Sequence, residues 1–114
     1  MCAYMQPKPS LIQHSLQALW CIAGAPLLAG TDIVHATPKT LSILANPEVT
    51  AVNQDLGYGG EVQGHIFVPA NETGGASEVW AKRLADGTYA AVLLNLNDTA
   101  TVDITLDWKA LPGE

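Results

Sequence analysis

The residue with the strongest claim to chemistry in this sequence is Asp32. It follows residues 26–30, a short apolar run bounded by proline and glycine that is typical of a strand buried on both faces of a parallel sheet. In folds of alternating strands and helices, an acid at the carboxyl end of a strand points toward the side where chemistry occurs. The alternative is a carboxylate that caps the following helix or bonds neighbouring loops. We favour this alternative because position in a fold does not by itself define a role.

Asn53, Gln54 and Asp55 form a second polar cluster that could be mistaken for a catalytic trio. The three residues are consecutive at the predicted end of a helix. Helix ends leave backbone groups without partners, and short polar side chains commonly bond to such groups. We therefore expect these residues to satisfy backbone groups at the junction with the next part of the chain.

Other reactive residue types lack the spacing that their chemistry requires. His14, His35 and His65 are accompanied by neither a cysteine pair nor a carboxylate cluster, so the sequence predicts no metal site. Ser15 and Ser42 do not stand in the Gly-x-Ser-x-Gly turn of serine hydrolases. Metal-assisted and serine-based hydrolysis are therefore not indicated.

Two tryptophans and two asparagines have alternative interpretations. Trp80 and Trp108 could stack on the apolar face of a pyranose, but at strand positions we favour a place in the core. Asn71 and Asn97 each begin an Asn-x-Thr sequon in a predicted loop, where a eukaryotic secretory route could add a glycan. These asparagines are N-glycosylation candidates.

The elements that must position these residues begin with a helix over residues 11–24. Its apolar side chains recur at helical spacing, and Ser10 is a candidate N-cap. Cys2 and Cys21 are expected to be free thiols, with Cys21 in the core. The predicted apolar face comprises Ile12, Leu16, Leu19, Trp20 and Ala23.

A second helical region follows the loop that contains Asp32. Thr37 as N-cap and Pro38 at the first helical position predict where it begins. Asn46 and Pro47 stop this helix and can cap a short further turn. The apolar side of the region is expected to comprise Leu41, Ile43, Leu44, Val49 and Val52.

After residues 57–60 the periodicity of the sequence changes from helical to twofold. This glycine-rich run has no phosphate-binding helix after it, so we interpret it as a hinge or domain boundary and not as a nucleotide loop. Ala85, Asp86 and Gly87 predict a hairpin turn in an antiparallel sheet. The four candidate strands are residues 61–68, 78–84, 88–95 and 101–108.

Composition limits the classes of partner. The 114 residues are 48% hydrophobic and 14% charged, which favours a packed protein. The net charge of −6 argues against nucleic acid and anionic membrane surfaces as partners. The mostly apolar run at residues 16–30 contains Pro26 and is shorter than the roughly 20 residues that span a bilayer. The first ten residues lack the pattern of a signal peptide.

Four motifs stand in order along the chain. They are LW at residues 19–20, APLL at 25–28 leading to Thr31 and Asp32, EVTAVNQD at 48–55, and EVW at 78–80. This series resembles the family 27 glycoside hydrolases, the α-galactosidases of the melibiase type. The similarity covers roughly residues 16–108, and an ordered series is more specific than any single motif.

The resemblance implies an α/β plus β fold: the last strand and helices of a (β/α)8 barrel, followed by part of an antiparallel C-terminal β-sandwich. Residues 1–56 would be the carboxyl-terminal portion of the barrel, with residues 1–13 irregular. Residues 57–60 would form the linker, and residues 61–114 a partial β domain. A complete barrel takes about 250 residues, so we expect the chain to hold only a piece of one.

The resemblance also implies an activity. Such enzymes are secreted and hydrolyse terminal, non-reducing α-D-galactose residues of galactosides with retention and without a cofactor. Retention requires two carboxylates about 5–5.5 Å apart. In this family both are aspartates on earlier barrel strands, in motifs such as Lys-Tyr-Asp that do not occur here. We therefore expect no catalytic residue in this sequence and no hydrolysis by the chain alone.

The alternative function belongs to a different class. A non-catalytic β module that binds carbohydrate or a protein partner would also fit the second half of the sequence. The sequence does not determine the oligomeric state.

Overall fold

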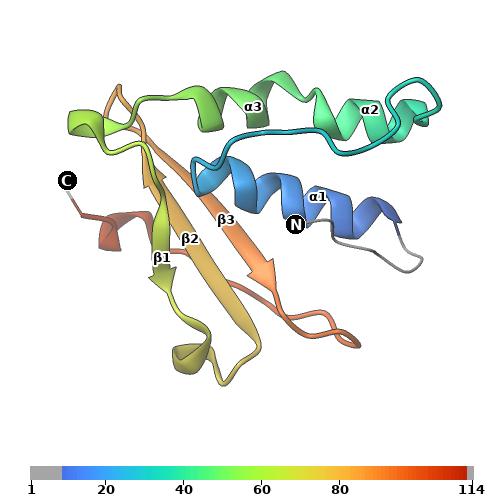
Figure 1. The fold of residues 1–114 in the computed structure, drawn as a ribbon. Coiled ribbons are helices and arrows are strands. Elements are labelled where there is room, and N and C mark those ends of the chain that lie inside the picture. The colour runs from blue at the N-terminus through green and yellow to red at the C-terminus, as the bar shows by residue number, and fades with distance from the viewer. Residues whose placement is uncertain (1–8, 113–114) are drawn as a thin grey trace.

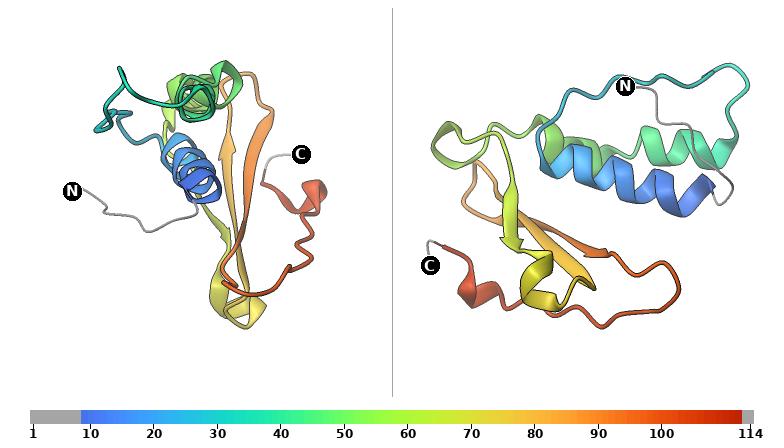
Figure 2. Two further views of the ribbon diagram at one scale, coloured as in Figure 1. Left: turned by 90° about the vertical axis from the view of Figure 1, so that its right-hand side faces the viewer. Right: turned by 60° about the horizontal axis from the view of Figure 1, so that its bottom comes forward.

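The computed structural model describes residues 9–112, which form a helical layer and a three-stranded sheet (Figure 1). Helix α1 packs against helices α2 and α3 on one side and against strands β2 and β3 on the other. Figure 2 shows the segment after β3 on the face of the sheet opposite the helices. No helix in the described part of the chain is long and apolar enough to cross a membrane.

Helix α1, Pro9–Ile22, begins earlier than the sequence predicts. Residues 9–13 are therefore helical, which corrects the expectation that residues 1–13 are irregular; residues 1–8, and with them Cys2, lie outside the described part of the chain. Proline is tolerated in a first helical turn, where its missing N–H has no partner to lose. Ser10 consequently lies within the helix and does not precede it as an N-cap.

The buried face of α1 also differs from the predicted one. Cys21 and Ile22 are each 1% exposed, whereas Ile12 and Trp20 are 38% and 44% exposed. The buried side also includes Gln17, which is 5% exposed and whose amide donates to Cys21 Sγ at 3.7 Å, so the spacing of apolar residues alone does not identify this side. Cys21 is a buried free thiol, as predicted, and burial raises its pKa.

Helices α2, Pro38–Leu44, and α3, Pro47–Gln54, begin as their caps predict. The Thr37 hydroxyl oxygen accepts a hydrogen bond from the Thr40 N–H at 3.1 Å. The Asn46 side-chain oxygen accepts from the N–H groups of Glu48 and Val49, at 3.0 and 3.2 Å. Each cap satisfies backbone donors that a helix start leaves open.

Residues 26–30 do not form the predicted buried strand. The segment has no regular secondary structure, and Leu28 in its middle is 83% exposed. A strand of a parallel sheet is held by neighbours on its edges. Among the described residues no strand pairs with this segment, so the apolar run stays exposed. We refer to residues 26–34 as the open segment.

The sheet contains β1, His65–Val68, β2, Ser77–Arg83, and β3, Tyr89–Asn95, in that order and all antiparallel. These strands confirm three of the four predicted ones, although β1 begins at His65 and not at residue 61. The Gly64 N–H instead donates to the Ile22 carbonyl at 2.8 Å, which holds the preceding residues against the end of α1. The predicted hairpin turn is confirmed by the bond from the Leu84 N–H to the Thr88 carbonyl, 2.8 Å.

The fourth predicted strand, residues 101–108, is wrong. The segment keeps its twofold pattern, because Val102, Ile104 and Leu106 are half-buried while the residues between them are exposed. It forms no ladder with the sheet, and strand assignment requires one. At its end Trp108 begins a short 3₁₀ helix and is 55% exposed, so its predicted place in the core is also wrong.

Candidate functional site

A buried polar contact joins the helical layer to the sheet at Lys82. Its side chain is 1% exposed, and its Nζ donates hydrogen bonds to the carbonyls of Val52 and Asp55 at 2.7 and 2.8 Å. These carbonyls belong to the carboxyl end of α3, which lacks internal donors and carries partial negative charge. Burial lowers the pKa of Lys82, and the Asp55 carboxylate offsets part of that effect.

Asp55 and Asn53 extend the same contact region. Asp55 Oδ1 accepts hydrogen bonds from the N–H groups of Gly57 and Ala85, both at 2.8 Å. Asn53 is buried, and its amide donates to the Ala25 carbonyl at 2.8 Å. The prediction that these side chains satisfy backbone groups is confirmed for Asn53 and Asp55, whereas the Gln54 amide donates to the Asn53 side-chain oxygen at 2.6 Å.

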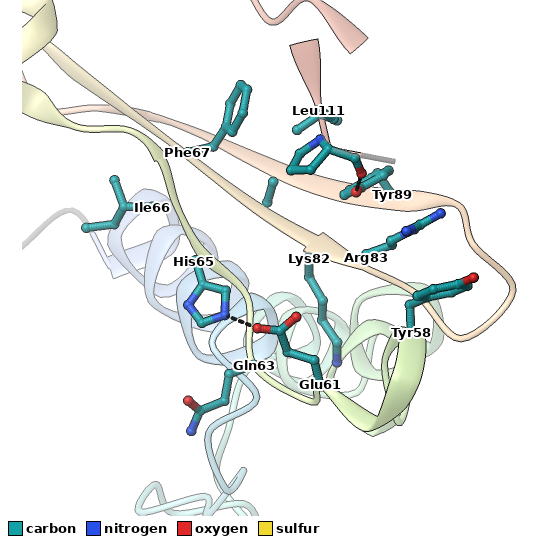
Figure 3. Close-up of a pocket in the computed structure, with 12 residues that line it drawn as sticks. Tyr58, Glu61, Gln63, His65, Ile66, Phe67, Lys82, Arg83, Tyr89 and Leu111 are labelled. Atoms are coloured by element: carbon teal, nitrogen blue, oxygen red, sulfur yellow. Dashed lines mark hydrogen bonds and ion pairs between the residues drawn. The ribbon is translucent and has the colours of Figure 1, made fainter. Parts of the chain in front are cut away.

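Beside this region lies a cavity of about 360 Å³ (Figure 3). The Arg83 guanidinium lies over the Tyr58 ring, 3.8 Å from its centre, and 5.9 Å from the centre of the Tyr89 ring. At the rim, His65 Nε2 and Glu61 Oε1 are 2.8 Å apart. The residues that line the cavity are Tyr58, Glu61, Gln63, His65, Ile66, Phe67, Ala81, Lys82, Arg83, Tyr89, Leu111 and Pro112.

The lining of the cavity does not provide the chemistry of a retaining glycosidase. That chemistry needs a nucleophilic carboxylate and a second carboxyl group as acid and base. Glu61 is the only carboxylate among the residues that line the cavity. The cavity can hold a small polar molecule against aromatic rings, but its side chains offer no pair of reacting groups.

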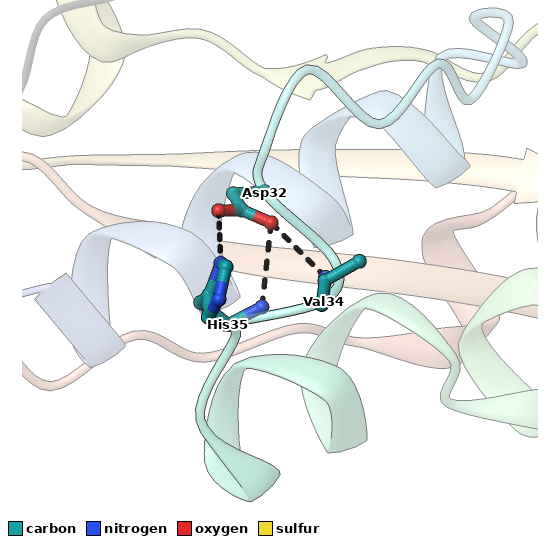
Figure 4. Close-up of polar contacts among 3 residues, drawn as sticks. All are labelled: Asp32, Val34 and His35. Carbon is teal, nitrogen blue, oxygen red and sulfur yellow. Dashed lines mark hydrogen bonds and ion pairs between the residues drawn. The ribbon is translucent and has the colours of Figure 1, made fainter.

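Asp32 lies in the open segment, apart from any bond to another element in the described residues (Figure 4). Its Oδ1 accepts from the N–H groups of Val34 and His35 at 3.1 and 3.3 Å, and Oδ2 lies 2.6 Å from His35 Nδ1. The His35 side chain, followed by the His35 N–H, lowers the pKa of the Asp32 carboxyl. The carboxylate therefore organises its own loop.

The remaining candidates lie apart from one another. The described residues contain no group of three or more histidine, cysteine, aspartate or glutamate side chains placed to hold a metal ion. Trp80 is half-buried on β2, and its indole N–H donates to Glu78 Oε2 at 3.2 Å. Asn71 is exposed in a 3₁₀ helix, Ala70–Thr73, and Asn97 is exposed in the loop after β3. Asn97 Oδ1 accepts from the N–H groups of Thr99 and Ala100, both at 2.9 Å.

Sequence reasoning missed Lys82 and Arg83. Both lie in a predicted strand, and the sequence alone assigns a role to neither. The usable signal was the twofold pattern, because Lys82 alternates with Trp80 and so shares the face of β2 that Trp80 occupies. The acceptors for Lys82 lie 27 and 30 residues away in the sequence, which no local pattern reveals.

The described residues form a helical layer that contacts part of an antiparallel sheet. The residues that line the cavity beside this contact include no catalytic carboxylate pair. Residues 74–114 match the model of a known domain family, the alpha galactosidase C-terminal beta sandwich domain. Whole proteins match the chain over 92 and 93 residues, so their similarity extends to residues before 74.

Those proteins are alpha-galactosidases. The chain is 45% identical over 92 residues to a "Probable alpha-galactosidase" of Dictyostelium discoideum, covering 80% of this chain and 22% of the relative. It is 38% identical over 93 residues to the alpha-galactosidase of Cyamopsis tetragonoloba, covering 81% and 20%. A crystal structure of a candidate alpha-galactosidase from Bacteroides fragilis superposes with a TM-score of 0.63 at 30% identity, covering 81% and 20%.

These similarities confirm the resemblance to α-galactosidases that the motifs indicated. The chain spans about a fifth of the length of the relatives that it matches. The matched family model is that of the domain at the carboxyl end of these enzymes. The resemblance to a glycoside hydrolase thus concerns a part, and not the whole, of such an enzyme.

Proposed function

We propose that this chain is the carboxyl-terminal portion of a retaining α-galactosidase that releases terminal, non-reducing α-D-galactose from galactosides. In this proposal residues up to 56 close the (β/α)8 barrel, residues 57–60 link the two parts, and residues 61–114 begin the β-sandwich. The observation that carries it is the similarity, over four fifths of the chain, to enzymes of which the matched residues make up about a fifth. The open segment then supplies the last barrel strand, whose neighbours lie in the rest of the enzyme.

The apolar side chains of the open segment support this assignment. Leu28, Ile33 and Val34 are 83%, 57% and 87% exposed. A large apolar side chain that is mostly exposed is one that an interface with another part of a protein would bury. A strand between two barrel neighbours would bury such side chains and pair both of its edges.

A chimera tests the proposal. Residues 16–114 of this chain replace the corresponding portion of the Cyamopsis tetragonoloba alpha-galactosidase, and hydrolysis of an aryl α-galactoside is measured. We expect the chimera to be active and the same enzyme cut before the junction to be inactive. A chimera that folds but does not turn over the substrate would contradict the proposal, as would turnover by the 114-residue chain alone.

The parent enzyme is proposed to be secreted, with Asn71 and Asn97 as acceptors of N-linked glycans. Both side chains are exposed, so a glycan at either position would extend into solvent. Expression of the parent in a eukaryotic secretory host should give a product that shrinks on treatment with a peptide N-glycosidase. Asn71→Gln and Asn97→Gln variants then report which position is used. An unchanged product would contradict the assignment.

Carbohydrate binding without catalysis is the second candidate function. It is favoured by one observation: the Trp108 indole is 55% exposed and so is available to stack on a sugar ring. Calorimetric titration of the chain with galacto-oligosaccharides, compared with a Trp108→Ala variant, tests it. Binding that Trp108→Ala abolishes would support this function, and absence of heat in both proteins would exclude it for these ligands.

A further inference from the structure

We propose that the glycine-rich run between the helices and the sheet is a locked joint, in which contacts from β2 and its hairpin hold residues 52–61 in one position. We call residues 52–61 together with residues 82–85 the joint. The glycine content of the run suggests a hinge. In the structure, Gly57, Gly59 and Gly60 all have positive φ. Three contacts that originate outside the run oppose such motion.

The first contact is the Lys82 ammonium. It reaches from β2 to two carbonyls at the end of α3 and is withdrawn from water. A buried donor that loses its acceptors is left unsatisfied, which is unfavourable by about 1–3 kcal/mol or more for a charged group. Motion of α3 away from the sheet would break both bonds at once.

The second contact is the Asp55 carboxylate, whose Oδ1 bridges the joint. One bond goes forward to the Gly57 N–H, and the other crosses to the Ala85 N–H in the β2–β3 hairpin. Gly57 is buried, and a Cβ added to it would lie 1.8 Å from the Glu61 carbonyl oxygen. The glycine is thus required for close backbone packing within the joint and not only for freedom of rotation.

The third contact is made by the Arg83 side chain to the ring of Tyr58, a residue of the run. The Arg83 guanidinium lies 3.8 Å from the centre of this ring. Guanidinium–aromatic contacts contribute about 0.5–1 kcal/mol at exposed sites and more when water is excluded. Lys82 and Arg83 are adjacent on β2, so two neighbouring side chains of this strand contact residues 52–61.

Limited proteolysis with chymotrypsin tests the proposal, because the chain contains its own reference site. Leu56 and Tyr58, in the joint, are 71% and 51% exposed, and Leu28 in the open segment is 83% exposed. A hinge would be cut at both places at similar rates. A locked joint must open before it can be cut, so we expect cleavage after Leu56 and Tyr58 to be at least roughly tenfold slower than after Leu28.

The Lys82→Met variant removes the ammonium while keeping an apolar stem of similar length. We expect cleavage in the joint to rise roughly tenfold while cleavage after Leu28 stays unchanged. Lys82→Arg should restore much of the protection, and Lys109→Met, at an exposed lysine, should have no effect. Equal cleavage at the two places in the original chain, or a joint that Lys82→Met leaves protected, would overturn the proposal.

A second variant covers the case in which Lys82→Met does not fold. Global unfolding would raise cleavage after Phe67 and Tyr89 in the sheet to the same extent as in the joint. Asp55→Ala then decides, since it removes the bridge between Gly57 and Ala85, together with the carboxylate charge near Lys82, and keeps the backbone carbonyls that Lys82 binds. A selective rise in cleavage of the joint supports the lock, and an unchanged pattern refutes it. None of these readouts depends on galactosidase activity.

Discussion

The joint and the open segment each contain a glycine-bearing connection between regular elements, yet the contacts of the two connections with the rest of the chain differ. In the joint, Lys82 and Asp55 tie the chain to the sheet through backbone groups. In the open segment, the bonds of Asp32 stay within its own loop. Because different elements contact the two connections, we expect the joint to be the more rigid of the two.

The largest expected effect comes from adding one methyl group to each connection. In Gly57→Ala the new Cβ would collide with the Glu61 carbonyl at positive φ, so we expect a loss of roughly 3 kcal/mol or more in the free energy of unfolding. In Gly30→Ala nothing lies within 4 Å of the new atom, so stability should stay within about 1 kcal/mol. Urea unfolding measures both. Similar values for the two variants would remove the distinction between the connections.

Truncation of an apolar side chain gives the next largest difference. Ile22 is 1% exposed where α1 meets the sheet, so Ile22→Ala should lower the free energy of unfolding by about 2–5 kcal/mol. Leu28→Ala, in the open segment, should change it by less than about 0.5 kcal/mol. Chemical denaturation of the two variants checks the pair, and an equal loss would mean that the open segment is packed in solution.

The pH dependence of stability reports on Lys82. Because its pKa is lowered in the folded chain, the unfolded chain binds this proton more tightly, and stability rises with pH between the lowered pKa and 10.5. We therefore expect the stability of the original chain relative to Lys82→Met to increase across that window. Denaturant unfolding at a series of alkaline pH values measures the difference. A difference that falls with pH would contradict the burial of the ammonium.

Asp32 provides the matched case in the open segment, with the opposite sign. Hydrogen bonds from His35 lower its pKa below 3.8, so its contribution is present above that value and is lost as the pH falls through the lowered pKa. Asp32→Asn should alter only the acid limb of the stability curve, and by a small amount because the carboxylate is exposed. A change in the alkaline limb would show that Asp32 acts on the joint.

The smallest effect on stability, with a clear effect on solubility, is expected from Leu28→Lys combined with Val34→Lys. Both side chains are mostly exposed, so the free energy of unfolding should stay within about 0.5 kcal/mol. Replacing these two exposed apolar side chains by lysine should reduce association between chains. Light scattering across a concentration series measures this. Unchanged light scattering would show that Leu28 and Val34 do not mediate association between chains.

The helix caps and the hairpin turn, which the sequence predicted correctly, depend on neighbours in the chain. Thr37 and Asn46 bond to donors two or three residues away, and the turn at Asp86 closes a hairpin within five residues. Such contacts are encoded within a short window. Their positions could therefore be predicted from residue types alone.

The features that the sequence did not predict depend on distant partners. Residues 26–30 and 101–108 have strand-like patterns, but a strand exists only where another strand pairs with it. Lys82 likewise gains its role from carbonyls on a helix far away in the chain. The resemblance to α-galactosidases, in contrast, followed from an ordered series of motifs and needed no three-dimensional information.

Amide hydrogen exchange tests the contrast between the two connections most directly. The N–H groups of Gly57 and Ala85 are both donated to Asp55 Oδ1, so NMR should show them to be protected by roughly tenfold or more. The N–H groups of residues 28–30 have no partner among the described residues and should exchange at the rate of an unstructured peptide. Equal exchange at the two places would contradict the account.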